Sequence, residues 1–136
     1  MTDCLFCSIV NKKIPSHTIY ENDSFIAFLD ISPVHVGHVL LVPKQHVETI
    51  EDMPFEYASD LLIGIQKISK ALRKQLGAQG INTIVNSGSI AGQEVFHAHI
   101  HIIPRFANDG LKHWPGKDAS EEDLVHAASK LINFLE

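Results

Sequence analysis

The feature that most constrains the fold of this chain is a short stretch in which histidines alternate with apolar residues. Residues 97 to 103 read His-Ala-His-Ile-His-Ile-Ile. Side chains of a strand point alternately to opposite faces, so this pattern predicts a strand with three histidines on one face and apolar residues on the core face. We expect this strand to run from Val95 to Ile103 and to stop at Pro104.

A strand face with three histidines has two obvious uses. One is a metal ion held by all three, and the other is a division of roles, with one nucleophile and two neighbours that tune or anchor it. At about 3.3 Å per residue, His97 and His101 would lie about 13 Å apart, whereas zinc–nitrogen bonds are about 2 Å long. Geometry therefore favours divided roles over a shared ion. A plain face of solvated histidines is the third interpretation.

The loop from Asn86 to Glu94 leads directly into the histidine strand and contains Gly88 and Gly92. Glycines let the backbone approach a ligand closely, and successive amides can surround an anion. The loop lacks the Gly-Lys-Ser/Thr ending of a Walker loop. Ser89 and Gln93 could add side-chain donors, so we expect a phosphate site here.

The remaining pattern predicts one α+β domain of 136 residues, with a core over about 4–105 and a tail and helix over 106–136. A helix from Asp3 to Val10 is expected to be capped by Thr2 or Asp3. Helical spacing predicts a long helix over 54–76, and Ser120 opens a final helix that ends at Leu135. Strands are predicted over 17–21, 25–29, 38–42, 81–85 and 95–103, forming a five-stranded antiparallel sheet with helices packed on one side.

Charge and hydropathy limit the partners of the chain. Lys and Arg number 11 against 16 acidic residues, a formal charge of −5, so we expect no binding to nucleic acid or to anionic membranes. The sequence starts without a secretory pattern, and its apolar runs, such as 25–29 and 39–42, are far shorter than the roughly 20 residues of a membrane helix. A cytoplasmic location is therefore expected.

The two cysteines, Cys4 and Cys7, form a single Cys-x-x-Cys motif. In a chain expected in the cytoplasm, such a pair is more typical of metal binding or redox chemistry than of a structural disulfide. No strand precedes the pair, which disfavours a thioredoxin-like redox role.

The His-Ala-His-Ile-His-Ile-Ile stretch resembles the signature of the histidine-triad superfamily of nucleotide hydrolases and transferases. Further segments are similar to its Hint branch, and they lie at residues 4–9, 27–33, 37–46, 86–88 and 92–97. The resemblance covers about Cys4 to Arg105. It implies a homodimer in which two five-stranded sheets join into one ten-stranded sheet.

The resemblance also implies a mechanism. His99, the middle histidine, would attack the α-phosphorus of a nucleotide ester, anhydride or phosphoramidate, and water would release the nucleoside monophosphate from a covalent nucleotidyl-histidine. Histidine suits this role because its ordinary pKa, about 6.5, leaves free imidazole at neutral pH. His101 would contact a phosphate oxygen, and His38 would complete a proton path to the leaving group.

A purine nucleotide site is implied by matching positions around the sequence. Asp30 would accept the ribose hydroxyls, although it could instead cap the turn at Ser32. Phosphate or ribose would be held by Asn86, Ser89 and Gln93. The base would lie among apolar residues that could equally belong to the core, namely Leu5, Phe6, Ile9, Phe28 and Ile31.

A structural zinc ion is the cofactor that the resemblance implies, and no organic cofactor is expected. Its ligands would be Cys4, Cys7, His46 and His97, a closed set with no open position for water. The alternative is two free thiols that pack as small hydrophobes.

The function favoured by these observations is hydrolysis of purine nucleoside phosphoramidates or related nucleotidyl bonds. A dinucleoside polyphosphate hydrolase and a nucleotide-binding regulatory module with little turnover are the alternatives. Trp114 in the tail could reach a partner subunit or pack on a crossover. The remaining histidines, His17, His35, His113 and His126, are expected to be solvated.

Overall fold

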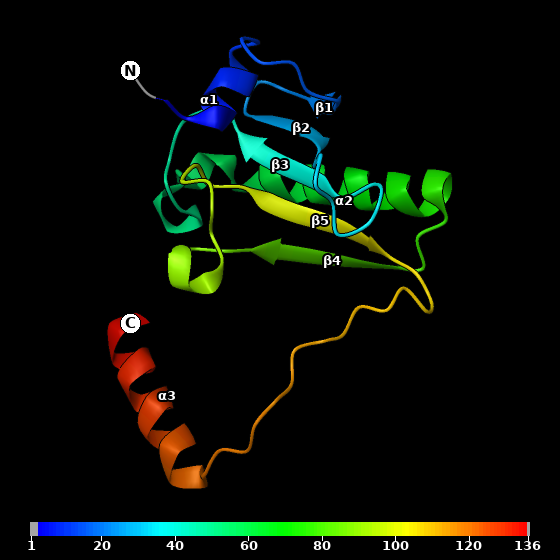
Figure 1. Ribbon diagram of the computed structural model, residues 1–136. Coiled ribbons are helices and arrows are strands. Elements are labelled where there is room, and N and C mark those ends of the chain that lie inside the picture. Colours follow the sequence, from blue (N-terminus) through cyan, green and yellow to red (C-terminus); the bar gives the residue numbers. More distant parts are fainter. Residues whose placement is uncertain (1–2, 136) are drawn as a thin grey trace.

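The computed structural model describes residues 3–135, and its centre is a five-stranded antiparallel sheet (Figure 1). The strands are β1 (Thr18–Glu21), β2 (Phe25–Leu29), β3 (Val39–Pro43), β4 (Gly80–Val85) and β5 (Ile100–Arg105). Their order in the sheet is β1-β2-β3-β5-β4, so β4 lies at an edge beside β5. The predicted α+β class and five-stranded antiparallel sheet are confirmed.

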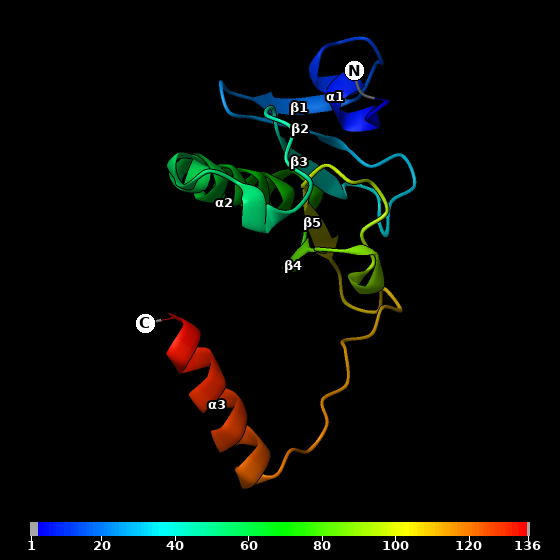
Figure 2. The same ribbon diagram turned by 90° about the vertical axis from the view of Figure 1, so that its left-hand side faces the viewer.

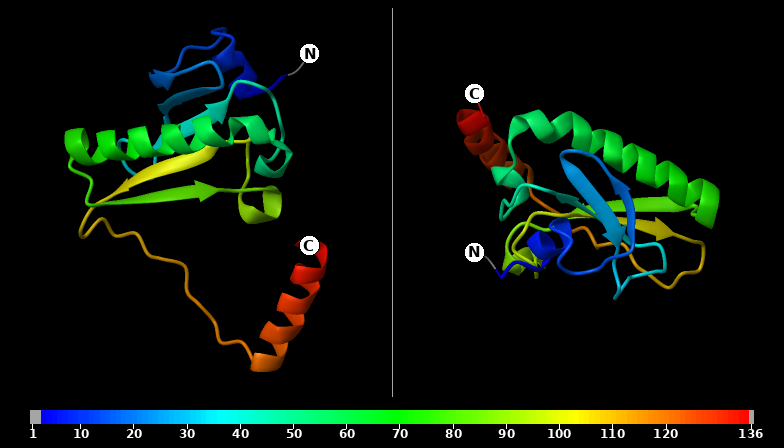
Figure 3. Two further views of the ribbon diagram at one scale, coloured as in Figure 1. Left: turned by 180° about the vertical axis from the view of Figure 1, so that it is seen from behind. Right: turned by 90° about the horizontal axis from the view of Figure 1, so that it is seen from above.

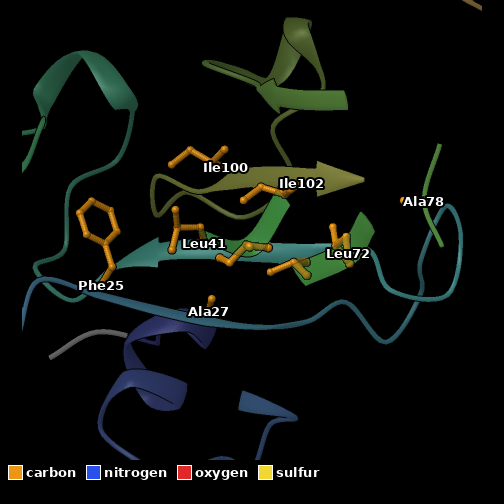
Figure 4. Close-up of a cluster of buried hydrophobic side chains, with 9 residues drawn as sticks. Phe25, Ala27, Leu41, Leu72, Ala78, Ile100 and Ile102 are labelled. Carbon is orange, nitrogen blue, oxygen red and sulfur yellow. The ribbon is translucent and has the colours of Figure 1, made fainter. Parts of the chain in front are cut away.

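Helix α2 (Ala58–Leu76) covers one face of the sheet (Figure 3). It follows a 3₁₀ turn (Phe55–Tyr57) and ends at Gly77, whose φ of 72° suits a residue without a Cβ. Figure 4 shows the core beneath it, where Phe25 and Ala27 of β2 lie with Leu41 of β3 and with residues of β5 and α2. The long helix on one face was predicted, and its first turn is 3₁₀ rather than α-helical.

Helix α1 (Leu5–Val10) lies on the opposite face, which corrects the expectation that the helices share one side. Phe6 and Ile9 of this helix pack against Ile26, Phe28 and Leu40. Because β2 and β3 carry apolar residues at successive positions, both faces of these strands are buried and each face needs a cover.

The cap of α1 also differs from the prediction. Cys4 is the N-cap, and its Sγ accepts a hydrogen bond from the backbone N–H of Cys7 at 3.4 Å. Asp3 precedes the cap, and Thr2 lies outside the described residues. The thiol sulfur therefore takes the role that the sequence analysis assigned to a hydroxyl or carboxylate.

Strand β5 begins and ends later than predicted. Residues 95–99 are irregular, and the strand then continues through Pro104, which lies opposite Ile81. The irregular start has a tertiary cause, because the N–H of Ala98 donates to the carbonyl of Val47 at 2.7 Å and not to a neighbouring strand. Only His101 of the three alternating histidines therefore lies within the regular strand.

The C-terminal part stands away from the sheet. Residues 110–120, here called the arm, lead past β4 to helix α3 (Glu121–Leu135), and Ser120 Oγ caps this helix by accepting from the N–H of Asp123 at 3.1 Å (Figure 2). The predicted surface tail and helix start are confirmed. No helix within residues 3–135 has the length and apolar character needed to cross a bilayer.

Three of the four histidines expected to be solvated, His17, His113 and His126, are exposed. His35 is an exception, because it is half-buried with its ring 4.4 Å from that of Phe106.

Gly37, which precedes the buried His38, gives a test of this packing. Its φ is 100°, and a Cβ there would lie 2.7 Å from Leu76 Cδ1. We expect Gly37→Ala to lower the free energy of unfolding by about 1–3 kcal/mol, measured by urea denaturation, because backbone strain and a close contact add. Gly116→Ala is the matched control, since Gly116 has open space around it. Equal stability of the two variants would contradict this account.

Candidate functional site

A cavity of about 490 Å³ opens on the α1 face of the sheet, within the size range of small-molecule sites. Its wall is built from α1, the end of β2, the loop 86–94 and β5. The lining includes nine of the predicted site residues: Leu5, Phe6, Ile9, Phe28, Asp30, Ile31, Asn86, His99 and His101. Segments far apart in the sequence thus meet at one hollow.

His99 is buried in the cavity wall with a fixed orientation. Its Nδ1 donates to the backbone carbonyl of His97 at 2.8 Å, which leaves Nε2 of the neutral ring with a free lone pair. The ring of Phe6 meets it edge-on, with centroids 5.0 Å apart. An imidazole held this way is a nucleophile whose reactive nitrogen needs no reorientation.

His38 and His101 form a hydrogen-bonded pair beside His99. The N–H of Val34 donates to His38 Nδ1 at 3.1 Å, so the proton of neutral His38 resides on Nε2. That Nε2–H donates to His101 Nδ1 at 2.9 Å, and the remaining proton of neutral His101 is therefore on its Nε2. The backbone at Val34 thereby fixes the tautomers of both rings.

The surroundings keep this pair neutral at physiological pH. Burial, together with the nearby His99 and His38 and against an opposing effect of Asp30, lowers the pKa of His101 to about 4. Burial also lowers the pKa of His38, against an opposing effect of Asp30. A neutral pair is the state that the assigned tautomers require.

Asp30 has two contacts, one from each carboxylate oxygen. Oδ1 accepts from the N–H of Ser32 at 2.8 Å, as the turn-capping interpretation expected. Oδ2 lies 3.8 Å from His38 Nε2, and the residue lines the cavity. The turn contact therefore leaves Oδ2 available to a ligand.

The glycine-containing loop is organised by Gln93. Its side chain is buried, accepts from the N–H of Gly88 at 2.8 Å and donates to the carbonyls of Glu48 and Val95 at 2.7 and 3.0 Å. Ser89 lies on an exposed 3₁₀ turn. Asn86 is the one of the three predicted loop donors that the structure places in the cavity wall.

Cys4, Cys7, His46 and His97 come together at the other end of the histidine stretch, with their ligand atoms within 4.8 Å of one another. His97 Nδ1 lies 3.4 Å from Cys4 Sγ, 3.5 Å from Cys7 Sγ and 3.1 Å from His46 Nδ1. In a tetrahedral zinc site, bond lengths of about 2.0 Å to nitrogen and 2.3 Å to sulfur place neighbouring ligands about 3.3–3.6 Å apart. The four residues therefore fit a zinc ion.

The chemistry of the donors points the same way. His97 Nε2 donates to the carbonyl of Pro43 at 2.8 Å, so Nδ1 of the neutral ring is unprotonated and faces the cysteines. This second contact is the type that orients a metal-binding histidine. The two thiols form no disulfide with each other and are partly exposed, which does not suit the alternative of small buried hydrophobes.

Asp30, His38 and His101 form a second group with metal-ligand atoms within 4.8 Å. The hydrogen bonds argue against a metal there. His38 Nδ1 already accepts from Val34, so a metal on Nε2 would require a ring with no proton on either nitrogen. The group is better suited to hydrogen bonding, with His38 Nε2–H donated to His101.

The sequence analysis missed three contributors to the site. Two are backbone groups, the N–H of Val34 and the carbonyl of Pro43, which carry no sequence signal. The third is Glu94, which lines the cavity and is the last residue of the predicted phosphate loop. Its position in the loop was the available signal.

Comparison with known proteins identifies relatives of the whole architecture. The family model described as "HIT domain" matches residues 11–108. Adenylylsulfatase HINT3 of Arabidopsis thaliana is 40% identical, covering 96% of this chain and 66% of the plant protein. Adenosine 5'-monophosphoramidase HNT1 of Saccharomyces cerevisiae is 37% identical, covering 98% of this chain and 83% of the yeast protein.

Solved structures support the same relationship. A crystal structure from Streptococcus mutans has a TM-score of 0.93 at 42% identity and covers 100% of this chain and 87% of that one. A Zn-bound histidine triad family protein from Mycobacterium smegmatis has a TM-score of 0.77 at 37% identity, covering 98% of both chains. The resemblance found from the sequence motifs is confirmed.

The pKa of His101 gives a pH prediction. The unfolded chain binds a proton at this histidine near pH 6.5, whereas the folded chain binds it only near pH 4, so folding stability falls as the pH drops through this window. We expect an NMR titration to place the midpoint of the His101 ring near 4. The exposed His113 serves as the reference signal, and a His101 midpoint at or above 6.5 would contradict the assignment.

The cysteine–histidine cluster predicts loss of metal in Cys7→Ser. A hydroxyl is a much poorer zinc ligand than a thiolate, and this change also removes a contact to His97. Native mass spectrometry should show one zinc ion per chain in the wild type and none in the variant, whose unfolding temperature should fall. Ser8→Ala on the same helix is the control. Equal metal content in Cys7→Ser and wild type would exclude this site.

Proposed function

Because the chain belongs to the HIT domain family, we propose that it is a nucleotide-binding hydrolase that cleaves purine nucleoside phosphoramidates or related nucleotidyl bonds. Two relatives named as an adenylylsulfatase and an adenosine 5'-monophosphoramidase support this class of substrate. The observation that carries the proposal is the hydrogen bond from His99 Nδ1 to the His97 carbonyl, which leaves an unprotonated nitrogen at the cavity.

His99 Nε2 would attack the α-phosphorus, forming a P–N bond as the bond to the leaving group breaks. Positive charge develops on the imidazole in this step. The His97 carbonyl, as acceptor of Nδ1–H, stabilises that charge. Water then attacks the same phosphorus, restores free His99 and releases the nucleoside monophosphate.

His101 and His38 would manage charge and protons on the other side of the phosphate. The Nε2–H of His101 is available to a phosphate oxygen or to the departing group. His38 keeps its proton and donates it in a hydrogen bond to His101 Nδ1, which holds the His101 Nε2–H toward the phosphate, and the departing group takes its proton from water. Asp30 Oδ2, 3.8 Å from His38 Nε2, would stabilise positive charge that develops on the pair as His101 donates. We propose these roles for the three residues together.

The nucleoside would occupy the apolar side of the cavity. Phe6, Phe28 and Ile31 line this side and would contact the base, while the carboxylate of Asp30 would accept the ribose hydroxyls. Asn86 would donate to phosphate or ribose from the loop. Ser89 and Gln93 are proposed to contribute to the same subsite, Gln93 by holding the loop backbone in place.

A structural zinc ion is proposed at Cys4, Cys7, His46 and His97, supported by the geometry of the four donors and by the Zn-bound relative. The ion would neutralise the thiolates and tie α1 to the segment before β5. With four protein ligands it leaves no open position for substrate. The backbone carbonyl of His97 is not one of the proposed zinc ligands, so it can accept the hydrogen bond from His99 while the His97 ring binds the ion.

We further propose that the chain forms a homodimer in the cytoplasm, with two sheets joined into a ten-stranded sheet. The edge position of β4 supports this, because its outer backbone groups lack a strand partner within the described residues. The acidic charge of the chain supports a small-molecule substrate and neither a nucleic-acid nor a membrane partner.

The central test is hydrolysis of adenosine 5'-phosphoramidate by wild type and His99→Ala. We expect the variant to lose at least about 10³-fold in kcat because its nucleophile is gone. The exposed His17→Ala is the control. Acid-quenched wild type should contain a peptide that spans His99 and carries the mass of AMP.

Three outcomes would contradict the proposal. Undiminished turnover in His99→Ala would remove the covalent mechanism. AMP binding without turnover by the wild type would favour the regulatory module, and cleavage restricted to dinucleoside polyphosphates would favour the alternative substrate class.

A further inference from the structure

Helix α3 presents a continuous apolar stripe that no other part of residues 3–135 covers. Leu124, Ala128, Leu131 and Leu135 recur at spacings of three and four residues, which places them on one helix face. Every described residue of α3 is exposed, with Leu131 61% and Leu135 78% accessible. A surface stripe of this kind marks an interaction site.

The position of α3 indicates where its partner lies. The arm carries the helix beyond β4, on the side of the sheet that α2 covers, and leaves it apart from its own sheet in both views (Figures 1 and 2). β4 is the edge strand at which a second copy would join. The structural likeness to the Streptococcus mutans protein covers the entire chain, so it includes the arm and α3.

We propose that the apolar stripe of α3 packs on the outward face of α2 in a second copy of this chain, so that two protomers exchange their arms. This inference rests on the homodimer proposed above. It assigns α3 a role in assembly, which is separate from the chemistry proposed for the cavity and its histidines.

The outward face of α2 has the right chemistry for this contact. Leu62 and Ile63, near its start, are 57% and 43% exposed, whereas Lys70 and Lys74 are exposed in its second half. These four residues lie on the side of the helix opposite the buried Ile68. The helix therefore offers an apolar half and a basic half.

Helix α3 shows the complementary arrangement. Its first turn holds Glu121, Glu122 and Asp123, and its second half holds Leu131 and Leu135. An antiparallel alignment places the acidic turn of α3 beside the basic half of α2, and the apolar halves beside each other. The helix dipoles are then also favourably opposed.

The charge of α3 disfavours a lipid surface as the partner. Helices that lie in membrane interfaces are usually rich in Lys and Arg on their polar face. α3 has three acidic residues in its first turn and Lys130 as its one lysine within residues 121–135. Binding to vesicles is therefore an outcome against the proposal.

The main experiment compares Leu131→Asp with Asn133→Asp by sedimentation equilibrium of the full chain. Leu131 lies in the apolar stripe, and Asn133 lies on the opposite face of the same helix. We expect the self-association Kd to rise by about tenfold or more in Leu131→Asp, because the contact would bury an unpaired charge. Asn133→Asp should remain like wild type, and both variants should retain wild-type helicity.

A charge exchange tests the alignment. Glu121→Lys with Asp123→Lys should weaken self-association, as should Lys70→Glu with Lys74→Glu. Combining all four changes should restore it, since opposite charges again face each other across the contact. Failure of this rescue would overturn the antiparallel pairing with α2.

The failures of the two proposals are distinguishable. A wild-type chain that is monomeric at all concentrations overturns both the dimer and the α3 contact. A wild-type dimer with an unchanged Kd in Leu131→Asp overturns the α3 contact alone. Binding of the wild type, but not Leu131→Asp, to phosphatidylcholine–phosphatidylserine vesicles would assign the stripe to lipid and also overturn it.

Discussion

The hydrogen bond between His99 Nδ1 and the carbonyl of His97 is the interaction on which the site depends. His97 contributes its side chain and its backbone to different contacts. Its ring faces Cys4 and Cys7, and its carbonyl orients the ring of His99. Residues 95–99 are irregular, and the carbonyl of His97 accepts from a side chain of its own segment at 2.8 Å. Departure from regular structure is thus the means by which the metal cluster and the cavity share one residue.

The two faces of the sheet differ in what they bury, since one packs an apolar core and the other holds the buried histidines. On the α2 face, Phe25, Leu41 and Ile102 are fully buried in an apolar core. On the α1 face, the buried histidines all have hydrogen-bond partners, and no buried side-chain polar atom within the described residues lacks one. A buried polar group is costly unless paired, so these bonds hold the rings in single orientations.

Local rules predicted the elements that local contacts determine. A continuous run of apolar and aromatic residues gave the bounds of β2, Gly77 ended α2, and Ser120 capped α3. The start of β5 was not predictable in this way, because a distant carbonyl, that of Val47, takes the N–H of Ala98. The candidate metal ligands and the cavity histidines were predicted from their motifs. The tautomers of the histidines were not predictable, because they depend on backbone groups that carry no sequence signal. Gln93 illustrates the same limit, since its amide is used within its own loop.

The fixed tautomers explain why three alternating histidines can have three different roles. Protons are ordered in one direction, from the N–H of Val34 to His38 and from His38 to His101, so His101 has a donor left over. His99 has its proton committed to a carbonyl and so has an acceptor left over. The rings of His99 and His101 have centroids 4.9 Å apart. Within the hydrogen-bonded pair of His38 and His101, protonating both rings would set two N–H groups against each other. Burial, by lowering both pKa values, therefore preserves a donor beside an unprotonated imidazole nitrogen, the arrangement that the proposed attack on phosphorus would use.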